Sequence, residues 1–205
     1  MSKRFERTTL YALDGEPIYQ YEGSLWETVY AAVKAGKSLA RANLIGADLS
    51  GLNLKGVIFN RASLREADLS NTDLRGAQFI AADLSSAKLS SACLYRASLH
   101  GANLFRSNMD RVKAGDAQFS GANLHMVYAR DARLTRCDFH RANLAFADLT
   151  GSDMEGANFE KACLFNAKVN NADMWNVNLE GCIVQGMNID SARAILLKSR
   201  EVARL

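Results

Sequence analysis

The amino-acid sequence predicts an all-β solenoid, in which short strands stack into a regular coil. From Leu39 to Ile189 a core-type residue falls at every fifth position, giving thirty-one centres: eighteen Leu, five Phe, three Met, two Val, one Ile and two Ala. The position two residues before each centre is Ala in nineteen cases. Neither the 3.6-residue period of a helix nor the two-residue period of a strand produces this spacing. A fixed short repeat instead indicates units that bury their apolar faces by stacking on their neighbours.

The repeated tripeptides are more specific than the spacing alone. Examples are Ala42-Asn43-Leu44, Ala47-Asp48-Leu49, Ala67-Asp68-Leu69, Ala82-Asp83-Leu84, Ala102-Asn103-Leu104 and Ala142-Asn143-Leu144. They resemble the A(D/N)LXX pattern of the pentapeptide-repeat family over about 150 of the 205 residues. This resemblance implies a right-handed quadrilateral β-helix with four pentapeptides per coil, in which the centre and the small residue point inward. Thirty-one units make about eight coils, and a rod roughly 37 Å long at the spacing of paired strands.

The phenylalanine centres support a coil of twenty residues. All five are separated by multiples of twenty, which places them on one side of the coil: Phe59, Phe79, Phe119, Phe139 and Phe159. Aromatic rings one coil apart lie at the distance of neighbouring strands. We therefore expect a ladder of stacked rings inside the coil.

Residues 1–37 are predicted to form an N-terminal cap on the β-helix, which itself spans residues 38–190. The cap begins with a β-hairpin from Thr8 to Glu22, and Asp14-Gly15 suits its tight turn. A helix follows, with Ser24 and Glu27 in the arrangement of a capping box. Such a cap would cover the apolar side chains and strand edges of the first coil.

Residues 191–205 are predicted to form a C-terminal helix with Asp190 as its N-cap. This helix would either close the last coil or form a twofold homodimer, as a C-terminal element does in members of the family that the sequence resembles. The apolar residues available for either role are Ile195, Leu196, Leu197, Val202 and Leu205.

Charge is distributed unevenly along the rod, although the net charge of the chain is only +3. Residues 39–114 carry ten basic and six acidic side chains, and residues 115–190 carry six basic and ten acidic ones. The four cysteines do not form a disulfide framework, which suits a reducing cytoplasm. No apolar run is long enough to span a membrane, and the charged first residues do not resemble a signal peptide.

The sequence contains no recognisable catalytic or metal-binding motif. His100, His125 and His140 each follow a centre, and the spacing of the coils keeps them too far apart to share a metal ion. Asp and Asn interchange freely before the centres, which a catalytic carboxylate could not tolerate but a residue that accepts a backbone hydrogen bond at a turn could. We therefore expect neither an enzyme nor a cofactor, and no small-molecule substrate.

Large apolar residues at outward positions predict a protein-binding surface. Phe105, Met126, Phe146 and Phe165 occupy four successive coils on the side whose centres include Leu104. Trp175 and Tyr95 are expected on an adjacent side. The acidic residues expected near this stripe are Asp148, Asp153, Glu155, Glu160, Asp173 and Glu180. The function favoured by this pattern is a non-catalytic scaffold that binds another protein through its outer walls.

Two other functions stay open. The resemblance to quinolone-resistance pentapeptide proteins implies a DNA-mimic modulator of DNA gyrase or topoisomerase IV, for which the acidic second half would supply the charge. Direct nucleic-acid binding by the basic first half is the other possibility, with Arg41, Lys55, Arg61, Arg65 and Arg75 as the contacting residues. The matching acidic residues of the rod argue against it, because they remove the excess positive charge that releases counterions.

Overall fold

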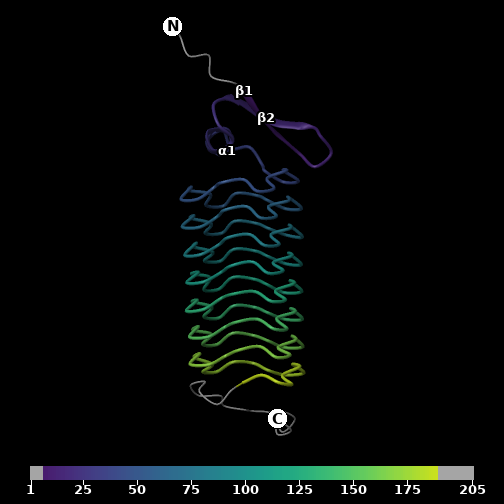
Figure 1. Ribbon diagram of the computed structural model, residues 1–205, viewed down its shortest axis with the longest axis vertical. Coiled ribbons are helices and arrows are strands. Elements are labelled where there is room, and N and C mark those ends of the chain that lie inside the picture. The colour runs from purple at the N-terminus through teal and green to yellow at the C-terminus, as the bar shows by residue number, and fades with distance from the viewer. Residues whose placement is uncertain (1–6, 189–205) are drawn as a thin grey trace.

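The computed structural model describes residues 7–188 and shows a stack of coils with a small cap at its N-terminal end (Figure 1). The cap consists of strand β1 (Arg7–Tyr11), strand β2 (Pro17–Glu22) and helix α1 (Leu25–Lys34). Below it the chain winds from residue 39 to residue 188 with a turn at every fifth residue. The predicted residues of the C-terminal helix, Ile195, Leu196, Leu197, Val202 and Leu205, lie outside the described part of the chain.

Each coil contains twenty residues, because parallel bridges join every wall residue to the residue twenty positions later. The series of bridges runs from Asn43 and Ser63 to Lys168 and Asn188. Every coil therefore has four walls, which we number in chain order by their outward residues: wall 1 contains residue 103, wall 2 residue 108, wall 3 residue 113 and wall 4 residue 118. Corners 1 to 4 are the two-residue turns that follow the wall of the same number. Wall 1 thus lies between corner 4 and corner 1.

The corners are hydrogen-bonded turns with a positive φ at their second residue. The Leu44 carbonyl accepts the N–H of Ala47 at 3.1 Å, and the residue between them, Gly46, has a φ of 65°. A positive φ occurs at all thirty second-corner positions from 41 to 186, and only ten of these are Gly. This is the arrangement of a type II turn. Wall carboxylates and amides stabilise it, because the Asp48 Oδ1 accepts the N–H of Ser50 at 3.0 Å.

The lumen is filled by the centres and by the small residues that precede them, all of which are buried over most of the rod. The predicted phenylalanine ladder is confirmed. The rings of Phe59 and Phe79 stack at 5.0 Å, those of Phe119 and Phe139 at 5.0 Å, and those of Phe139 and Phe159 at 4.7 Å. Leu99 occupies the step between Phe79 and Phe119, so the ladder consists of two separate stacks.

The cap covers the first coil by apolar packing and by backbone pairing. Leu10, Val29 and Ala32 are buried in the same apolar core as Leu39. The end of β1 and the residues that follow it pair with wall 1, since the Tyr11 carbonyl accepts the Asn43 N–H and the Leu13 N–H donates to the Arg41 carbonyl, both at 2.8 Å. The strand edge of the first coil is therefore occupied on this side, which prevents edge-to-edge association there.

Helix α1 has a capping box at its N-terminal end and a glycine with a positive φ just after its C-terminal end. The side chain of Ser24 accepts the N–H of Glu27, and the carboxylate of Glu27 accepts the N–H of Ser24, which completes a capping box. At the other end Gly36 has a φ of 68°, and the Lys37 N–H donates to the Ala32 carbonyl at 3.0 Å. Glycine adopts that conformation without the steric cost of a Cβ, which suits this position after the helix.

Candidate functional site

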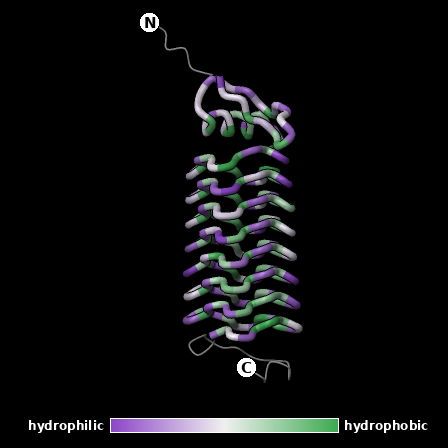
Figure 2. The backbone as a smooth tube through the Cα atoms, turned by 45° about the vertical axis from the view of Figure 1, so that its right-hand side comes forward, coloured by the Kyte–Doolittle hydropathy of each residue, from purple (hydrophilic) through white to green (hydrophobic). Residues whose placement is uncertain are grey.

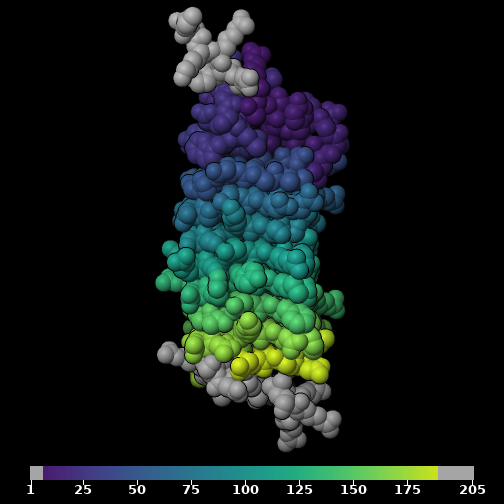
Figure 3. Space-filling model, in the orientation of Figure 1, coloured from purple at the N-terminus to yellow at the C-terminus, as the bar shows by residue number. Residues whose placement is uncertain are grey.

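The outer surface of the rod offers no group of side chains suited to catalysis in the part of the chain that the structure describes. No cluster of three or more His, Cys, Asp or Glu residues in 7–188 could hold a metal ion. His100 Nε2 lies 2.7 Å from Gln118 Oε1, and His140 Nδ1 lies 3.7 Å from Glu160 Oε2. Burial raises the pKa of the Cys137 thiol to about 12, so this cysteine is not a nucleophile at neutral pH. The visible face of the rod is convex and closely filled (Figure 3).

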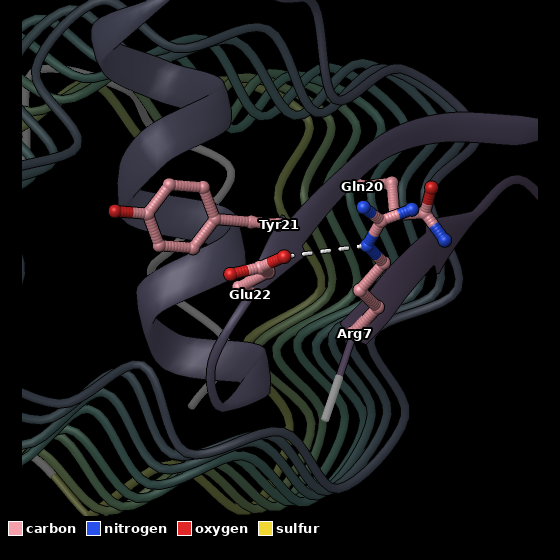
Figure 4. A pocket seen from close by; sticks show the side chains of 4 residues that line it. All are labelled: Arg7, Gln20, Tyr21 and Glu22. Atoms are coloured by element: carbon pink, nitrogen blue, oxygen red, sulfur yellow. Dashed lines mark hydrogen bonds and ion pairs between the residues drawn. The ribbon is translucent and has the colours of Figure 1, made fainter. Parts of the chain in front are cut away.

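Hollows occur at the cap. One of about 610 Å³ lies between β2 and α1 and is lined by aromatic residues that include Trp26 and Tyr30. Another, of about 430 Å³, lies on the hairpin beside the ion pair between Arg7 and Glu22, whose Nε and Oε1 atoms are 3.5 Å apart (Figure 4). Both are open to solvent, and neither contains the convergent acid and base groups that a reaction requires.

Four aromatic side chains lie in series along corner 1, and we call them the aromatic corner: Phe105, His125, Phe146 and Phe165. The rings of Phe105 and His125 stack with centroids 5.7 Å apart. His125 then meets the edge of Phe146 at 5.5 Å, and Phe146 meets Phe165 at 5.5 Å. Phe146 is 46% exposed, and the other three are half-buried. The series continues over four successive coils.

The sequence prediction placed Met126 in this series, and the structure replaces it with His125. Both residues belong to corner 1 of the same coil, but the first corner position contains His125, twenty residues from both Phe105 and Ala145. The twenty-residue spacing from Phe105 through 125 to 165 was the signal that could have identified it. In the next coil Ala145 is too small to continue the series, and the ring comes from Phe146 at the second corner position.

Polar walls border the aromatic corner on both sides. On wall 1 the side-chain amides form a ladder, because Asn103 Nδ2 donates to Asp83 Oδ1 and Asn123 Nδ2 donates to Asn103 Oδ1, each at 3.0 Å. On wall 2 the next outward residues are Tyr128, which is 49% exposed, and Asp148, to which it is bridged. The guanidinium of Arg106 lies over the ring of Phe105 at 4.9 Å.

The other predicted members of the binding surface do not lie beside the aromatic corner. Phe165 and Trp175 are ten residues apart, which is half a coil, so Trp175 lies on corner 3, diagonally opposite. Asp153 on wall 3 and Glu155 on corner 3 share that far side, and Tyr95 also lies on corner 3. Glu160 lies on corner 4, across wall 1 from the aromatic corner. The predicted adjacency is therefore wrong for these residues, and of the predicted carboxylates Asp148 alone borders it.

The basic residues of the first half do not form a single nucleic-acid surface. They lie on three corners: Arg41 and Arg61 on corner 4, Lys55 and Arg75 on corner 3, and Arg65 on corner 1. Three of them are paired with carboxylates, since Arg41 contacts Asp14 at 2.8 Å, Arg75 contacts Asp73 at 2.6 Å and Arg65 contacts Glu66 at 3.8 Å. Their charge is spread around the rod and partly neutralised.

Hydropathy alternates within every coil, and no uniformly apolar segment crosses the rod (Figure 2). Within residues 7–188, no helix has both the length and the apolar character that spanning a bilayer requires.

Comparison with known proteins identifies the repeat. The family model described as pentapeptide repeats matches eight copies over residues 35–61, 62–101, 82–125, 97–136 and 137–181. No curated protein sequence matches significantly.

Among solved structures, HetL, a pentapeptide repeat protein involved in heterocyst differentiation regulation in Nostoc sp. strain PCC 7120, is 23% identical. The match covers 81% of this chain and 95% of that one, with a TM-score of 0.42. QnrB1, a plasmid-mediated fluoroquinolone resistance protein, is 20% identical over 71% of this chain and 84% of that one, with a TM-score of 0.46. A second pentapeptide repeat protein from Nostoc PCC 7120 is 31% identical over 37% of this chain and 62% of that one, with a TM-score of 0.36. The assignment rests on the repeat model, which matches most of the chain: this protein belongs to the pentapeptide repeat family.

Proposed function

We propose that this protein is a non-catalytic scaffold that binds another protein through the aromatic corner. The observation that supports the proposal is the contact series from Phe105 through His125 and Phe146 to Phe165, in which each ring touches the next on the outer surface. Aromatic side chains are enriched among the residues that contribute most to binding, particularly where polar groups surround them. The amide ladder of wall 1 supplies such a border.

Phe146 occupies the second position of its corner, where the backbone conformation is costly for a bulky residue. Its φ is 59°, a region in which bulky residues are uncommon and which costs roughly 1–2 kcal/mol relative to the right-handed region. Asn166 occupies the equivalent position one coil later with a φ of 53°, and Asn tolerates this conformation better. Asn or Gly would reduce this cost, but Arg106 and Met126 bear it at the same position in the two preceding coils, so the ring contacts of Phe146, and not its backbone, support the proposal.

The test removes the rings and keeps the coil. Each substitution copies the residue that the chain itself places one coil away at the same position: Phe105→Ser (as Ser85), Phe146→Asn (as Asn166) and Phe165→Gln (as Gln185). We expect the triple variant to keep its circular dichroism spectrum and to lose at least about tenfold in affinity for the partner that the wild-type protein captures, since three anchors are removed. Trp175→Thr, which removes an exposed ring on corner 3, is the matched control. Equal capture by the triple variant and the wild type would eliminate the aromatic corner as the binding site.

A modulator of DNA gyrase or topoisomerase IV is the second candidate, and the acidic residues of the last coils are the observation that favours it. Asp153 and Asp173 on wall 3 and Glu155 on corner 3 present three carboxylates in adjacent coils. A supercoiling assay with each enzyme, with and without a fluoroquinolone, tests this candidate. We expect inhibition or protection that is lost in Asp153→Asn/Asp173→Asn, and an unchanged reaction at micromolar protein would exclude it.

A further inference from the structure

Wall 3 contains an ordered series of charges that is not neutralised within the chain. Its outward residues in four successive coils are Lys113, Arg133, Asp153 and Asp173. None of the four forms an ion pair within residues 7–188, and the two carboxylates accept only the backbone N–H of the residue two positions later. Charges one coil apart do pair at neighbouring corners, where Arg136 contacts Asp116 at 2.7 Å. The series on wall 3 is therefore free to bind charges from outside.

We infer that a second copy of this chain docks antiparallel against wall 3. A twofold axis across the wall, between the coils of Arg133 and Asp153, reverses the order of the four charges. Arg133 then faces the partner's Asp153, and Lys113 faces the partner's Asp173. Because the coils of both copies have the same spacing, one axis aligns four ion pairs at once.

The same charges favour this register over its neighbours. If the axis moves by half a coil toward the cap, Arg133 faces the partner's Arg133, and only the two contacts between Lys113 and the partner's Asp153 remain favourable. If it moves half a coil the other way, Asp153 faces the partner's Asp153, and only the two contacts between Arg133 and the partner's Asp173 remain favourable. A parallel arrangement in register places like charges opposite each other in all four coils. Like-charge contacts cost free energy and therefore help to reject wrong partners and registers.

The same twofold axis also brings residues of corner 3 of the two copies together. Trp175, which is 48% exposed, would lie against the partner's Gly115. That position does not require glycine for its backbone, because Gly115 is not among the glycines with positive φ. A Cβ at Gly115 would lie 3.1 Å from Thr135 Oγ1 and 3.5 Å from the ring of Tyr95. Thr135 and Tyr95 thus already occupy the space beside Gly115, and Trp175 would pack against the backbone of Gly115 and against the ring of Tyr95, which is 37% exposed.

The dimer is expected to be weak and sensitive to salt. Among the coils that the structure describes, four of each copy overlap, about 19 Å of wall at the spacing of paired strands, which places the contact at the small end of specific interfaces. We expect a dissociation constant on the order of 10–100 μM at low ionic strength. The aromatic corner lies on the opposite side of the rod and stays accessible, so this inference does not depend on the proposed function.

Charge reversal tests both the surface and its register. One variant is Lys113→Asp/Arg133→Asp, which makes the four charges uniformly acidic, and another is Asp153→Lys/Asp173→Lys, which makes them uniformly basic. The third combines all four substitutions and restores a complementary series with opposite polarity. Arg61→Asp/Arg141→Asp changes the net charge as much as the first variant but on corner 4, away from wall 3, and is the control.

Sedimentation equilibrium of the full chain at about 200 μM measures the outcome, in about 0.05 M and about 0.5 M NaCl. We expect the wild type, the fourfold variant and the control to dimerise at low salt, and each two-site variant to bind itself at least about tenfold more weakly. High salt should weaken the dimer severalfold. A monomeric wild type, a dimer that survives both two-site variants, or a fourfold variant that stays monomeric would overturn the inference. Survival of both would indicate another interface, including one formed by residues 191–205.

Discussion

Replacing Phe139 by Leu tests whether ring stacking inside the coil stabilises the fold. Phe139 is 1% exposed and stacks on two rings, Phe119 at 5.0 Å and Phe159 at 4.7 Å, with interplanar angles of 10°. Leu is a compatible replacement, because Leu99 and Leu179 occupy the same inward position in other coils. The substitution therefore removes the two ring contacts and a small volume without introducing a polar group.

Phe119→Leu is the matched variant. Phe119 is also fully buried and lies in the coil before Phe139, but it stacks on one ring, because Leu99 precedes it in the column. The loss of transfer energy and the small cavity are common to both variants, and together they cost about 1 kcal/mol in either one. Each ring pair adds about 0.5–1.5 kcal/mol. We therefore expect Phe139→Leu to lower the free energy of unfolding by about 2–4 kcal/mol, and Phe119→Leu by about 1.5–2.5 kcal/mol.

Urea titration followed by circular dichroism measures the difference between the two variants. The comparison requires that the slope of the free energy against urea stays the same, because repeat proteins can unfold in parts. Equal destabilisation by the two substitutions, or a larger loss for Phe119→Leu, would refute the contribution of stacking and leave volume as the explanation.

Three further predictions concern the corners and the ionisable groups. Gly121→Val should destabilise the protein by about 1–2 kcal/mol in thermal or urea unfolding. Gly121 has a φ of 66° with open space around it, so the cost comes from the backbone strain of a β-branched residue and not from a clash. Gly121→Asn should destabilise the protein clearly less. The hydrogen bond from Arg136 and, after it, that from Tyr95 hold the pKa of Asp116 below its usual value. The stabilisation by Asp116 is therefore present above the unfolded pKa near 4 and is lost as the pH falls through the lowered folded value. In a carbon-13 NMR titration Arg136→Gln should raise the pKa of Asp116, and an unchanged pKa would contradict the assignment. Burial raises the pKa of Cys137 to about 12. Iodoacetamide at pH 8 should therefore alkylate the half-exposed Cys93 and Cys163 before Cys137, which should react only after unfolding, as read by mass spectrometry.

The sequence was sufficient to predict the coil and its core, because both depend on a single period. A centre at every fifth residue and phenylalanines at multiples of twenty determine which side chains meet inside, and Phe119, Phe139 and Phe159 stack as that period requires. Interchange of Asp and Asn also identified the residues that accept backbone hydrogen bonds at corners, such as Asp48. These inferences need only local chemistry repeated many times.

The surface was harder to predict, because either residue of a corner can contribute a side chain to the same surface. The sequence pattern treats His125 and Met126 as equivalent outward positions, but the ring series uses His125 in one coil and Phe146, from the other position, in the next. The prediction also judged which residues are neighbours by their separation along the sequence. Trp175 is only ten residues after Phe165, yet ten residues are half a coil and bring it to the far side of the rod.

The twenty-residue coil has a consequence for how insertions change this protein. An insertion of five residues that follows the repeat pattern would keep every backbone bridge possible and every centre inside, but it would rotate all later outward residues by a quarter turn. Inserted between positions 125 and 146, for instance, it would carry Phe146 and Phe165 onto a different corner from Phe105. An insertion of twenty residues would leave the rotation unchanged and only lengthen the gap along the axis by about 4.8 Å. Stability and surface geometry therefore respond to different changes in length, and a chain of this kind can gain or lose binding surfaces while its interior stays the same.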